Sequence, residues 1–216
     1  MKLTKYVSAV TFSLVLMSQN LNAISDGLKN DIQCLVKNNP HQLNETEYTS
    51  IAEILTNKTP CNMLVFGLGK DSKLWMDNNS LGKTVFLEDD KTWFDRICAE
   101  IPGINAYLVN YNSQRKDWQN WLKGNTQDLL LDLPSEILET KWDIIFVDAP
   151  AGWSDETPGR MKSIYTAAHL AHKSKGCHVF VHDCNRKVEA VYCSKFLLDE
   201  NLVSSPYKLR HYFIPK

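Results

Sequence analysis

Short apolar segments recur along this chain, and most of them are followed by a segment with helical spacing. The strand-like segments are residues 62–66, 83–88, 104–111, 142–150, 177–183 and 207–215. The helix-like segments are residues 25–38, 45–57, 71–79, 89–101, 159–173 and 185–200. Strands that alternate with helices fold into a parallel sheet with helices on both faces. The sequence therefore predicts one α/β domain with a Rossmann-like, doubly wound, mostly parallel sheet.

Composition sets the limits of this prediction. The chain has 216 residues, of which 44% are hydrophobic and 23% are charged, as in an ordinary globular protein. Its formal net charge is −1, which argues against a nucleic-acid partner held by bulk electrostatics. The polar segment 112–140 predicts a loop with one or two short helices.

The first 23 residues have the pattern of a secretory signal peptide. Lys2 and Lys5 precede the apolar run YVSAVTFSLVLM, and Ala23 stands at a plausible cleavage point. We therefore assign residues 24–216 to the folded domain. The alternatives are an uncleaved anchor and a buried first helix.

Cysteines and glycosylation sequons are both consistent with secretion. The six cysteines form an even set, which suits disulfide pairing in an oxidising compartment, although several lie in apolar patterns typical of buried thiols. Asn44, Asn57 and Asn78 begin Asn-x-Ser/Thr sequons.

Polar residues gather where the predicted strands end. The successive strand ends carry Gly67-Leu68-Gly69, Glu88-Asp89-Asp90, Asp148-Ala149-Pro150 and His182-Asp183-Cys184-Asn185. Carboxyl ends of parallel strands meet at one edge of a sheet, and ligands bind at that edge. The sequence therefore predicts a site there.

Two glycines and an acidic residue indicate an adenosine-type ligand. Gly67 and Gly69 allow a sharp turn and a close approach of the backbone, and Glu88 ends the next strand, where a carboxylate binds ribose hydroxyls. Ser72 replaces the third glycine of a dinucleotide fingerprint. The alternatives are a tight strand-to-helix turn for the glycines and a helix cap for Glu88.

The neighbouring acidic residues distinguish between ligands. Asp148 and Asp183 would repel a pyrophosphate, whereas they suit the sulfonium cation of S-adenosylmethionine or a divalent metal. We expect S-adenosylmethionine rather than a nicotinamide dinucleotide.

Five segments carry a resemblance to a known family. They are LVFGLGKDSKLW, GKTVFLEDDKTWFDRI, WDIIFVDAPAGW, ETPGRMKSIYTAAHLA and VFVHDCNRKVEAVYCSKFL, in this order. The set resembles the plant polysaccharide-biosynthesis family that includes glucuronoxylan 4-O-methyltransferase and arabinogalactan glucuronic acid O-methyltransferase. The resemblance runs over residues 30–214 and implies S-adenosylmethionine-dependent methylation of the 4-hydroxyl of glucuronic acid side chains in the secretory pathway.

The resemblance also implies roles for individual residues. Gly67, Gly69, Asp71 and Glu88 would hold the cofactor, with Asp148 beside them. A sugar hydroxyl needs a base or a metal to take its proton, and the candidates are Asp148, His182 and Asp183. His182 could instead be a half-buried histidine of the strand.

A cation site is a further expectation. Asp148, Asp183 and Asn185 resemble in placement the Asp/Asp/Asn site of catechol-type O-methyltransferases, and their oxygens suit Mg²⁺ or Mn²⁺. The alternative is that Asp183 caps the following helix while Asn185 bonds the backbone.

Two residues of one loop are candidates for substrate contact. Arg160 would clamp the carboxylate of a uronic acid, and Trp153 would stack on a sugar face. The alternatives are a salt bridge from Arg160 to Asp155 or Glu156 and a loop anchor for Trp153.

Taken together, these residues predict an enzyme of the Golgi lumen or the secreted space that methylates an acidic polysaccharide. The alternative is a family member that keeps the methyltransferase fold and serves as a non-catalytic polysaccharide-binding or assembly factor.

Overall fold

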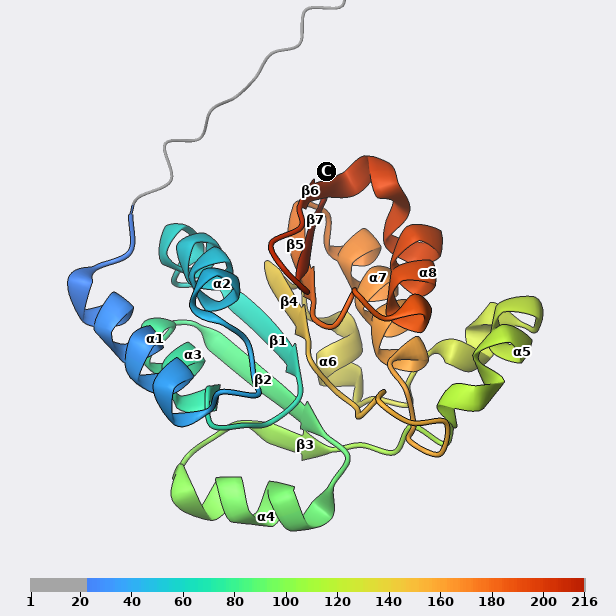
Figure 1. Ribbon diagram of the computed structural model, residues 1–216, viewed down its shortest axis with the longest axis horizontal. Helices are drawn as coiled ribbons and strands as arrows, with labels where there is room; N and C mark the ends of the chain where they lie inside the picture. Colours follow the sequence, from blue (N-terminus) through green and yellow to red (C-terminus); the bar gives the residue numbers. More distant parts are fainter. Residues whose placement is uncertain (1–22, 216) are drawn as a thin grey trace, which may run out of the picture.

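A seven-stranded sheet forms the centre of the computed structural model, which describes residues 23–215 (Figure 1). The strand order is β3-β2-β1-β4-β5-β7-β6. The strands are β1 (Asn62–Phe66), β2 (Lys83–Glu88), β3 (Ala106–Leu108), β4 (Ile144–Val147), β5 (Cys177–Val181), β6 (Leu202–Ser204) and β7 (Arg210–Ile214). Strands β1 to β5 pair in parallel, and β7 pairs antiparallel to both β5 and β6. The predicted doubly wound, mostly parallel sheet is thus confirmed.

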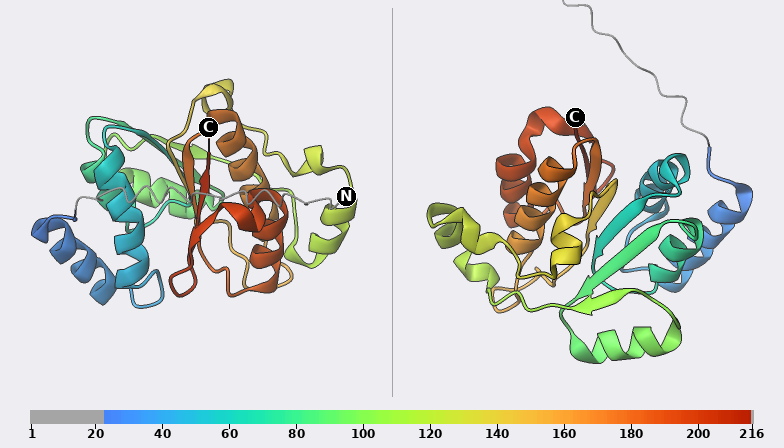
Figure 2. Two further views of the ribbon diagram at one scale, coloured as in Figure 1. Left: turned by 90° about the horizontal axis from the view of Figure 1, so that it is seen from above. Right: turned by 180° about the vertical axis from the view of Figure 1, so that it is seen from behind.

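Helices cover both faces of this sheet. They are α1 (Asp26–Asn38), α2 (Glu45–Lys58), α3 (Ser72–Asn78), α4 (Lys91–Glu100), α5 (Trp118–Lys123), α6 (Ser135–Glu139), α7 (Met161–Ser174) and α8 (Lys187–Cys193). Helices α1 to α3 lie on one side of the sheet and α6 to α8 on the other, as both views of Figure 2 also show. Shorter helical turns are η1 (Arg115–Asp117), η2 (Thr126–Leu129), η3 (Ser194–Leu198, a π-helical turn) and η4 (Asp199–Asn201).

The alternation of side chains along the strands divides the core in two. In β1, Met63 and Val65 lie on the face covered by α1 and α2, whereas Leu64 and Phe66 lie on the face covered by α7 and α8. Because successive side chains of a strand point to opposite faces, a strand that is buried on both faces must be apolar throughout. Strand β4 is apolar throughout, and β1, β2 and β5 are mostly apolar, with polar residues near their ends.

Local sequence explains where several helices begin and which large side chains are buried. Ser25 and Asn44 cap α1 and α2, and Asn44 forms a reciprocal capping box with Glu47. Asp90, rather than Asp89, caps α4. Trp75 and Trp142 are buried in the core.

Other elements differ from the predictions. The third strand is limited to Ala106–Leu108, and segment 112–140 contains four short helical elements instead of one or two. The helix predicted over 185–200 ends at Cys193 and continues as η3 and η4. Strand β6 has no counterpart in the prediction, because its three residues are all exposed and lack any apolar alternation.

The strand order reverses between β1 and β4. Strand β1 lies between β2 and β4, and the chain leaves β1 toward α3 on one face but reaches β4 from α6 on the other. Ligands of open α/β sheets bind at such a reversal of strand order.

The predicted signal segment lies outside the described residues. Within residues 23–215, no helix is long and apolar enough to cross a bilayer. The six cysteines are all free in the structure, so the predicted disulfide pairing is absent from it, and the sulfurs of Cys184 and Cys193 lie 3.7 Å apart.

Candidate functional site

A cavity of about 290 Å³ opens at the carboxyl ends of β1, β2 and β4. It is lined by Asn39, Gln42, Tyr48, Val65, Gly67, Leu68, Gly69, Lys70, Asp71, Glu88, Trp93, Phe146, Asp148 and Ala149. All five residues predicted to hold the cofactor are in this set. The structure therefore brings them together around one hollow at the reversal of strand order.

The glycine turn forms the floor of the cavity. Gly67 has a φ of +122°, and a Cβ atom added to it would lie 3.3 Å from the Cβ of Ala149. A side chain at this position would thus be strained and crowded. The hydroxyl of Ser72 accepts a hydrogen bond from Gly69 N at 2.9 Å, so this serine fixes the turn in place of a third glycine.

Glu88 ties the turn to the second strand. One oxygen of its carboxylate accepts a hydrogen bond from Leu68 N at 3.0 Å, and the other accepts from Asp89 N and Asp90 N at 2.9 and 2.8 Å. The side chain is 6% exposed and still lines the cavity. Each carboxylate oxygen has two lone-pair positions, so this arrangement leaves acceptor capacity for a ligand hydroxyl.

Asp71 adds a second carboxylate. It accepts a hydrogen bond from the indole nitrogen of Trp75 at 3.0 Å. Burial, followed by the nearby charge of Asp148, raises the pKa of Asp71 to about 6. A cationic ligand beside these two carboxylates would relieve their repulsion.

The N-terminal helices supply residues that the sequence pattern did not reveal. Tyr48 of α2 is 2% exposed and lines the cavity together with Asn39 and Gln42 from the α1–α2 connection. Burial and the charge of Asp71 raise the pKa of the Tyr48 phenol. Trp93 of α4 also lines the cavity and donates its indole N–H to the carbonyl of Leu68.

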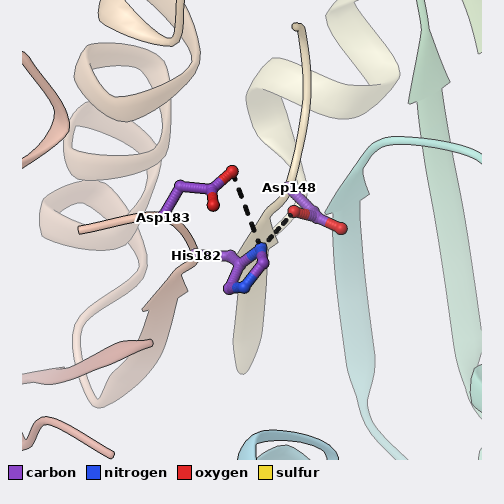
Figure 3. Close-up of side chains that lie close together, drawn as sticks. All are labelled: Asp148, His182 and Asp183. Atoms are coloured by element: carbon purple, nitrogen blue, oxygen red, sulfur yellow. Dashed lines mark hydrogen bonds and ion pairs between the residues drawn. The ribbon is translucent and has the colours of Figure 1, made fainter. Parts of the chain in front are cut away.

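Asp148, His182 and Asp183 form a cluster behind the cavity (Figure 3). The Nδ1 atom of His182 lies 2.9 Å from Asp148 Oδ1 and 3.8 Å from Asp183 Oδ2. The three predicted catalytic residues are therefore neighbours. Asp148 alone of the three lines the cavity, whereas His182 and Asp183 are 6% and 8% exposed.

Arg160 neutralises this cluster from within the protein. Its side chain is 6% exposed, and Nη2 lies 3.1 Å from both Asp148 Oδ1 and Asp183 Oδ2. The guanidinium also donates to the carbonyls of Pro150, His182 and Asp148. Burial alone would raise the pKa of Asp148, but Arg160 and His182 hold it below its ordinary value.

This geometry differs from the predicted clamp on a substrate carboxylate. Arg160 faces inward and its donors are engaged by five oxygen atoms of the protein. Neither Asp155 nor Glu156 is among its partners, and Asp155 pairs with Arg115 instead. In this arrangement Arg160 organises the cluster.

A buried carboxylate of α2 stands on the other side of His182. Glu47 is 1% exposed, and its Oε1 atom lies 3.6 Å from His182 Nε2. The same oxygen accepts a hydrogen bond from Lys208 N at 2.9 Å. His182 is thus enclosed between two carboxylates and is not among the residues that line the cavity.

The predicted metal ligands are only partly assembled. Asp148, His182 and Asp183 place one ligand atom each within 4.8 Å of one another, whereas the side chain of Asn185 is exposed. The guanidinium of Arg160 already spans both carboxylates. A dication would have to share these oxygens with a fixed positive charge, so the donor set fits a metal poorly.

The remaining predicted substrate residue is at the surface. Trp153 is 73% exposed and belongs to the loop between β4 and α7. Gly152 packs the base of this loop against α8, because a Cβ atom added to it would lie 2.6 Å from Glu189 Oε1.

Comparisons with known proteins show which family this chain is similar to. The family model described as IRX15/IRX15L/GXM matches residues 46–212. Glucuronoxylan 4-O-methyltransferase 1 of Arabidopsis thaliana is 40% identical over 76% of this chain, and Arabinogalactan O-methyltransferase 1 of the same plant is 37% identical over 81%. The matched regions span 64% and 68% of those two relatives.

A solved structure shows the same fold. A putative caffeoyl-CoA O-methyltransferase from Staphylococcus aureus aligns with a TM-score of 0.53 over 87% of this chain and 92% of its own, at 12% identity. That likeness supports the architecture alone. The family model covers most of the chain and includes the glycine turn, the acidic strand ends and the Arg160 loop, and the chain belongs to the IRX15/IRX15L/GXM family.

Proposed function

We propose that this chain is an S-adenosylmethionine-dependent O-methyltransferase that acts on the 4-hydroxyl of glucuronic acid residues in a polysaccharide. The observation that carries the proposal is the cavity in which Gly67, Gly69, Glu88, Asp71 and Asp148 meet. Relatives named as glucuronoxylan 4-O-methyltransferases, at 36–40% identity, support the reaction and the substrate class.

The chemistry of the cavity orients the cofactor. The ribose hydroxyls would face Glu88, and the sulfonium would lie toward Asp148 and Asp71, where the negative charge is greatest. A second hollow of about 380 Å³ lies beside the ends of β2 and β3, and its lining includes Asp89 and Asn110. Its carboxylate and amide groups suit the amino group and ring nitrogens of adenine.

Methyl transfer itself needs little beyond positioning. The acceptor oxygen attacks the methyl carbon as the C–S bond breaks, and the hydroxyl proton leaves the oxygen. Asp148 is the carboxylate at the cavity wall, and Arg160 and His182 keep it ionised, so it is the proton acceptor in this proposal. His182 and Asp183 hold Asp148 in place.

A divalent cation has no part in this proposed mechanism. Arg160 supplies the positive charge that a metal would otherwise bring to Asp148 and Asp183. Methyl transfer that survives chelation with EDTA would agree with this assignment. Activity lost on chelation and restored by Mg²⁺ or Mn²⁺ would restore the predicted metal site.

The compartment follows from the substrate. Polysaccharides of this class are assembled in the secretory pathway, and the predicted signal peptide at residues 1–23 would deliver the domain there. We propose the Golgi lumen or the secreted space.

Calorimetric titration tests the function. The purified domain is titrated with S-adenosylmethionine and with S-adenosylhomocysteine, alongside Glu88→Ala and, as a control, the surface variant Glu136→Ala. We expect micromolar affinity that only Glu88→Ala abolishes, followed by methyl transfer to glucuronoxylan. A folded protein that binds neither compound would favour the non-catalytic assembly factor, which has the same fold without the cofactor.

A further inference from the structure

Two exposed aromatic side chains stand at the carboxyl edge of the sheet. Trp153 and Tyr207 are 73% and 74% exposed, and they are the two aromatic residues among the large hydrophobic side chains exposed within residues 23–215. The loops that carry them are far apart in sequence. One connects β4 to α7 and the other connects β6 to β7.

Both loops contact the same short turn. Lys208 O, next to Tyr207, accepts a hydrogen bond from Cys184 N at 2.8 Å. A Cβ atom added to Gly152, next to Trp153, would lie 3.4 Å from Arg186 Nη1. Cys184 and Arg186 both follow Asp183, so the two aromatic residues adjoin the turn that leaves the cluster behind the cavity.

The backbone holds Tyr207 in an unfavourable conformation. Its φ is +53°, a value that residues with a side chain rarely adopt, and Leu209 N closes the turn by donating to Pro206 O at 2.9 Å. Holding a large ring outward in this backbone conformation costs free energy, and nothing offsets that cost in a loop that has no binding partner. This cost points to a binding role for the ring.

Two positively charged side chains lie beside these loops. The side chain of Arg186 is 29% exposed, and its Nη1 atom is buried, 3.0 Å from Asp183 Oδ2 and 3.9 Å from Glu189 Oε1. Lys208 Nζ lies 5.5 Å from the centre of the Tyr207 ring. Unlike Arg160, whose side chain is 6% exposed, Arg186 and Lys208 are partly exposed.

We propose that Trp153 and Tyr207 form a platform for the acceptor polysaccharide and that Arg186 binds the carboxylate of its uronic acid. The two rings pack against the C–H faces of sugar rings, which are flat and apolar enough to cover an aromatic side chain. The guanidinium of Arg186 meets the uronate and discriminates against neutral chains. This inference rests on the proposed function and names the surface that selects its substrate.

The test measures binding of glycans rather than turnover. Dissociation constants are determined by calorimetry for oligosaccharides released from unmethylated glucuronoxylan and for neutral xylo-oligosaccharides of equal length. The variants are Trp153→Ala, Tyr207→Ala, Tyr207→Phe and Arg186→Gln. Matched controls are Leu81→Ala, an apolar side chain that is 87% exposed before β2, and Arg96→Gln, a cation on α4.

We expect each alanine variant to weaken binding of the acidic chain about tenfold, the effect of losing one stacked ring, while Tyr207→Phe retains affinity. Arg186→Gln should abolish the preference for acidic over neutral chains. Both controls should match the wild type. Affinity for S-adenosylmethionine, measured on the same preparations, should be retained in the two alanine variants, which shows that they fold.

Two results would overturn the platform. One is wild-type affinity for the acidic chain in both alanine variants, and the other is a wild-type protein that binds S-adenosylmethionine but neither kind of chain. Loss of the proposed function has a different signature, because a domain that fails to bind S-adenosylmethionine can still bind glycans through this surface.

Discussion

Asp71 is a carboxylate whose environment opposes its charge. Its pKa is raised to about 6, mainly by burial, whereas an unfolded aspartate titrates near 3.9. Between about pH 4 and pH 6 the folded chain therefore holds a proton that the unfolded chain has released. It follows that the contribution of Asp71 to the free energy of unfolding falls as the pH rises through this window.

Asp71→Asn isolates this contribution. Asparagine keeps a carbonyl oxygen for the Trp75 indole but does not ionise. We expect the variant to gain stability relative to the wild type between pH 4 and pH 6, with no further change above that range. Urea denaturation at a series of pH values measures the difference, and parallel curves for the two proteins would contradict it.

Arg160 offers a second test at the level of one residue. If it compensates Asp148 and Asp183 in the interior, Arg160→Met leaves two buried carboxylates unpaired and lowers the free energy of unfolding by about 3–5 kcal/mol. Arg160→Lys keeps the charge but not the planar fork, so its effect should be smaller.

The control for Arg160 is the exposed Arg96 of α4, which pairs with Glu100. Arg96→Met should change stability by less than about 1 kcal/mol, because exposed ion pairs contribute little. Chemical denaturation compares the four proteins. An Arg160→Met variant as stable as the wild type would return this residue to the predicted role of substrate clamp.

These residues show how far local sequence can predict a site. Gly67, Glu88 and Asp148 end strands of one parallel sheet, so their strand positions alone place them at one edge. The enclosure of His182 by Glu47 could not be predicted in this way. It depends on how α2 packs across the sheet, and a glutamate in the first turn of a helix looks like an ordinary part of a capping box.

Among the elements, the loop between β4 and α7 packs closely against α8 at Gly152. Gly152 leaves room for the carboxylate of Glu189, which is fully buried and lacks a hydrogen-bond partner among the described residues. Burial raises the pKa of this carboxyl group. Any side chain at residue 152 would displace either the loop or the carboxylate.

Gly152→Ala should therefore destabilise the protein by about 1–3 kcal/mol, the usual effect of overpacking. Gly27→Ala in α1 is the matched control, since its new Cβ atom would meet only Ser25 Oγ at 3.9 Å and alanine favours a helix. Thermal unfolding compares both with the wild type. Equal melting temperatures for the two variants would exclude the proposed contact.

Elements were predictable where burial imposes a pattern on the sequence. The strands β1, β2, β4 and β5 are apolar because both of their faces are covered, and the sequence shows this directly. The exposed β6 is defined only by its partner β7, and the early end of α8 arises from a π-helical turn that keeps helical apolar spacing. Neither feature leaves a local signal.

For the molecule as a whole, two buried histidines couple stability to pH. His178 of β5 and His211 of β7 are cross-strand neighbours, and their ring nitrogens Nδ1 and Nε2 lie 2.9 Å apart. Burial lowers the pKa of His178 to about 3 and that of His211 to about 4. Unfolded histidine, with a pKa near 6.5, begins to take up a proton at a pH at which both folded rings are still neutral.

Taken alone, these two histidines should lower the free energy of unfolding as the pH drops from 6.5 toward 4, since the unfolded chain takes up protons that both folded rings exclude, and this contribution opposes that of Asp71. His178→Gln and His211→Gln should each reduce this slope by about one proton. Urea denaturation between pH 4 and pH 7.5 measures it. Slopes equal to that of the wild type would show that the strand pair is not responsible.

The hydrogen bond between Glu47 and Lys208 has a consequence for how the chain is made. Its two ends are separated by 161 residues, and at roughly 5–20 residues per second a ribosome needs on the order of 8–32 s to synthesise the second after the first. During that interval Glu47 of α2 lacks the backbone N–H of Lys208, with which it pairs in the folded protein. The N-terminal helices can therefore complete this packing only after the last strands have been synthesised.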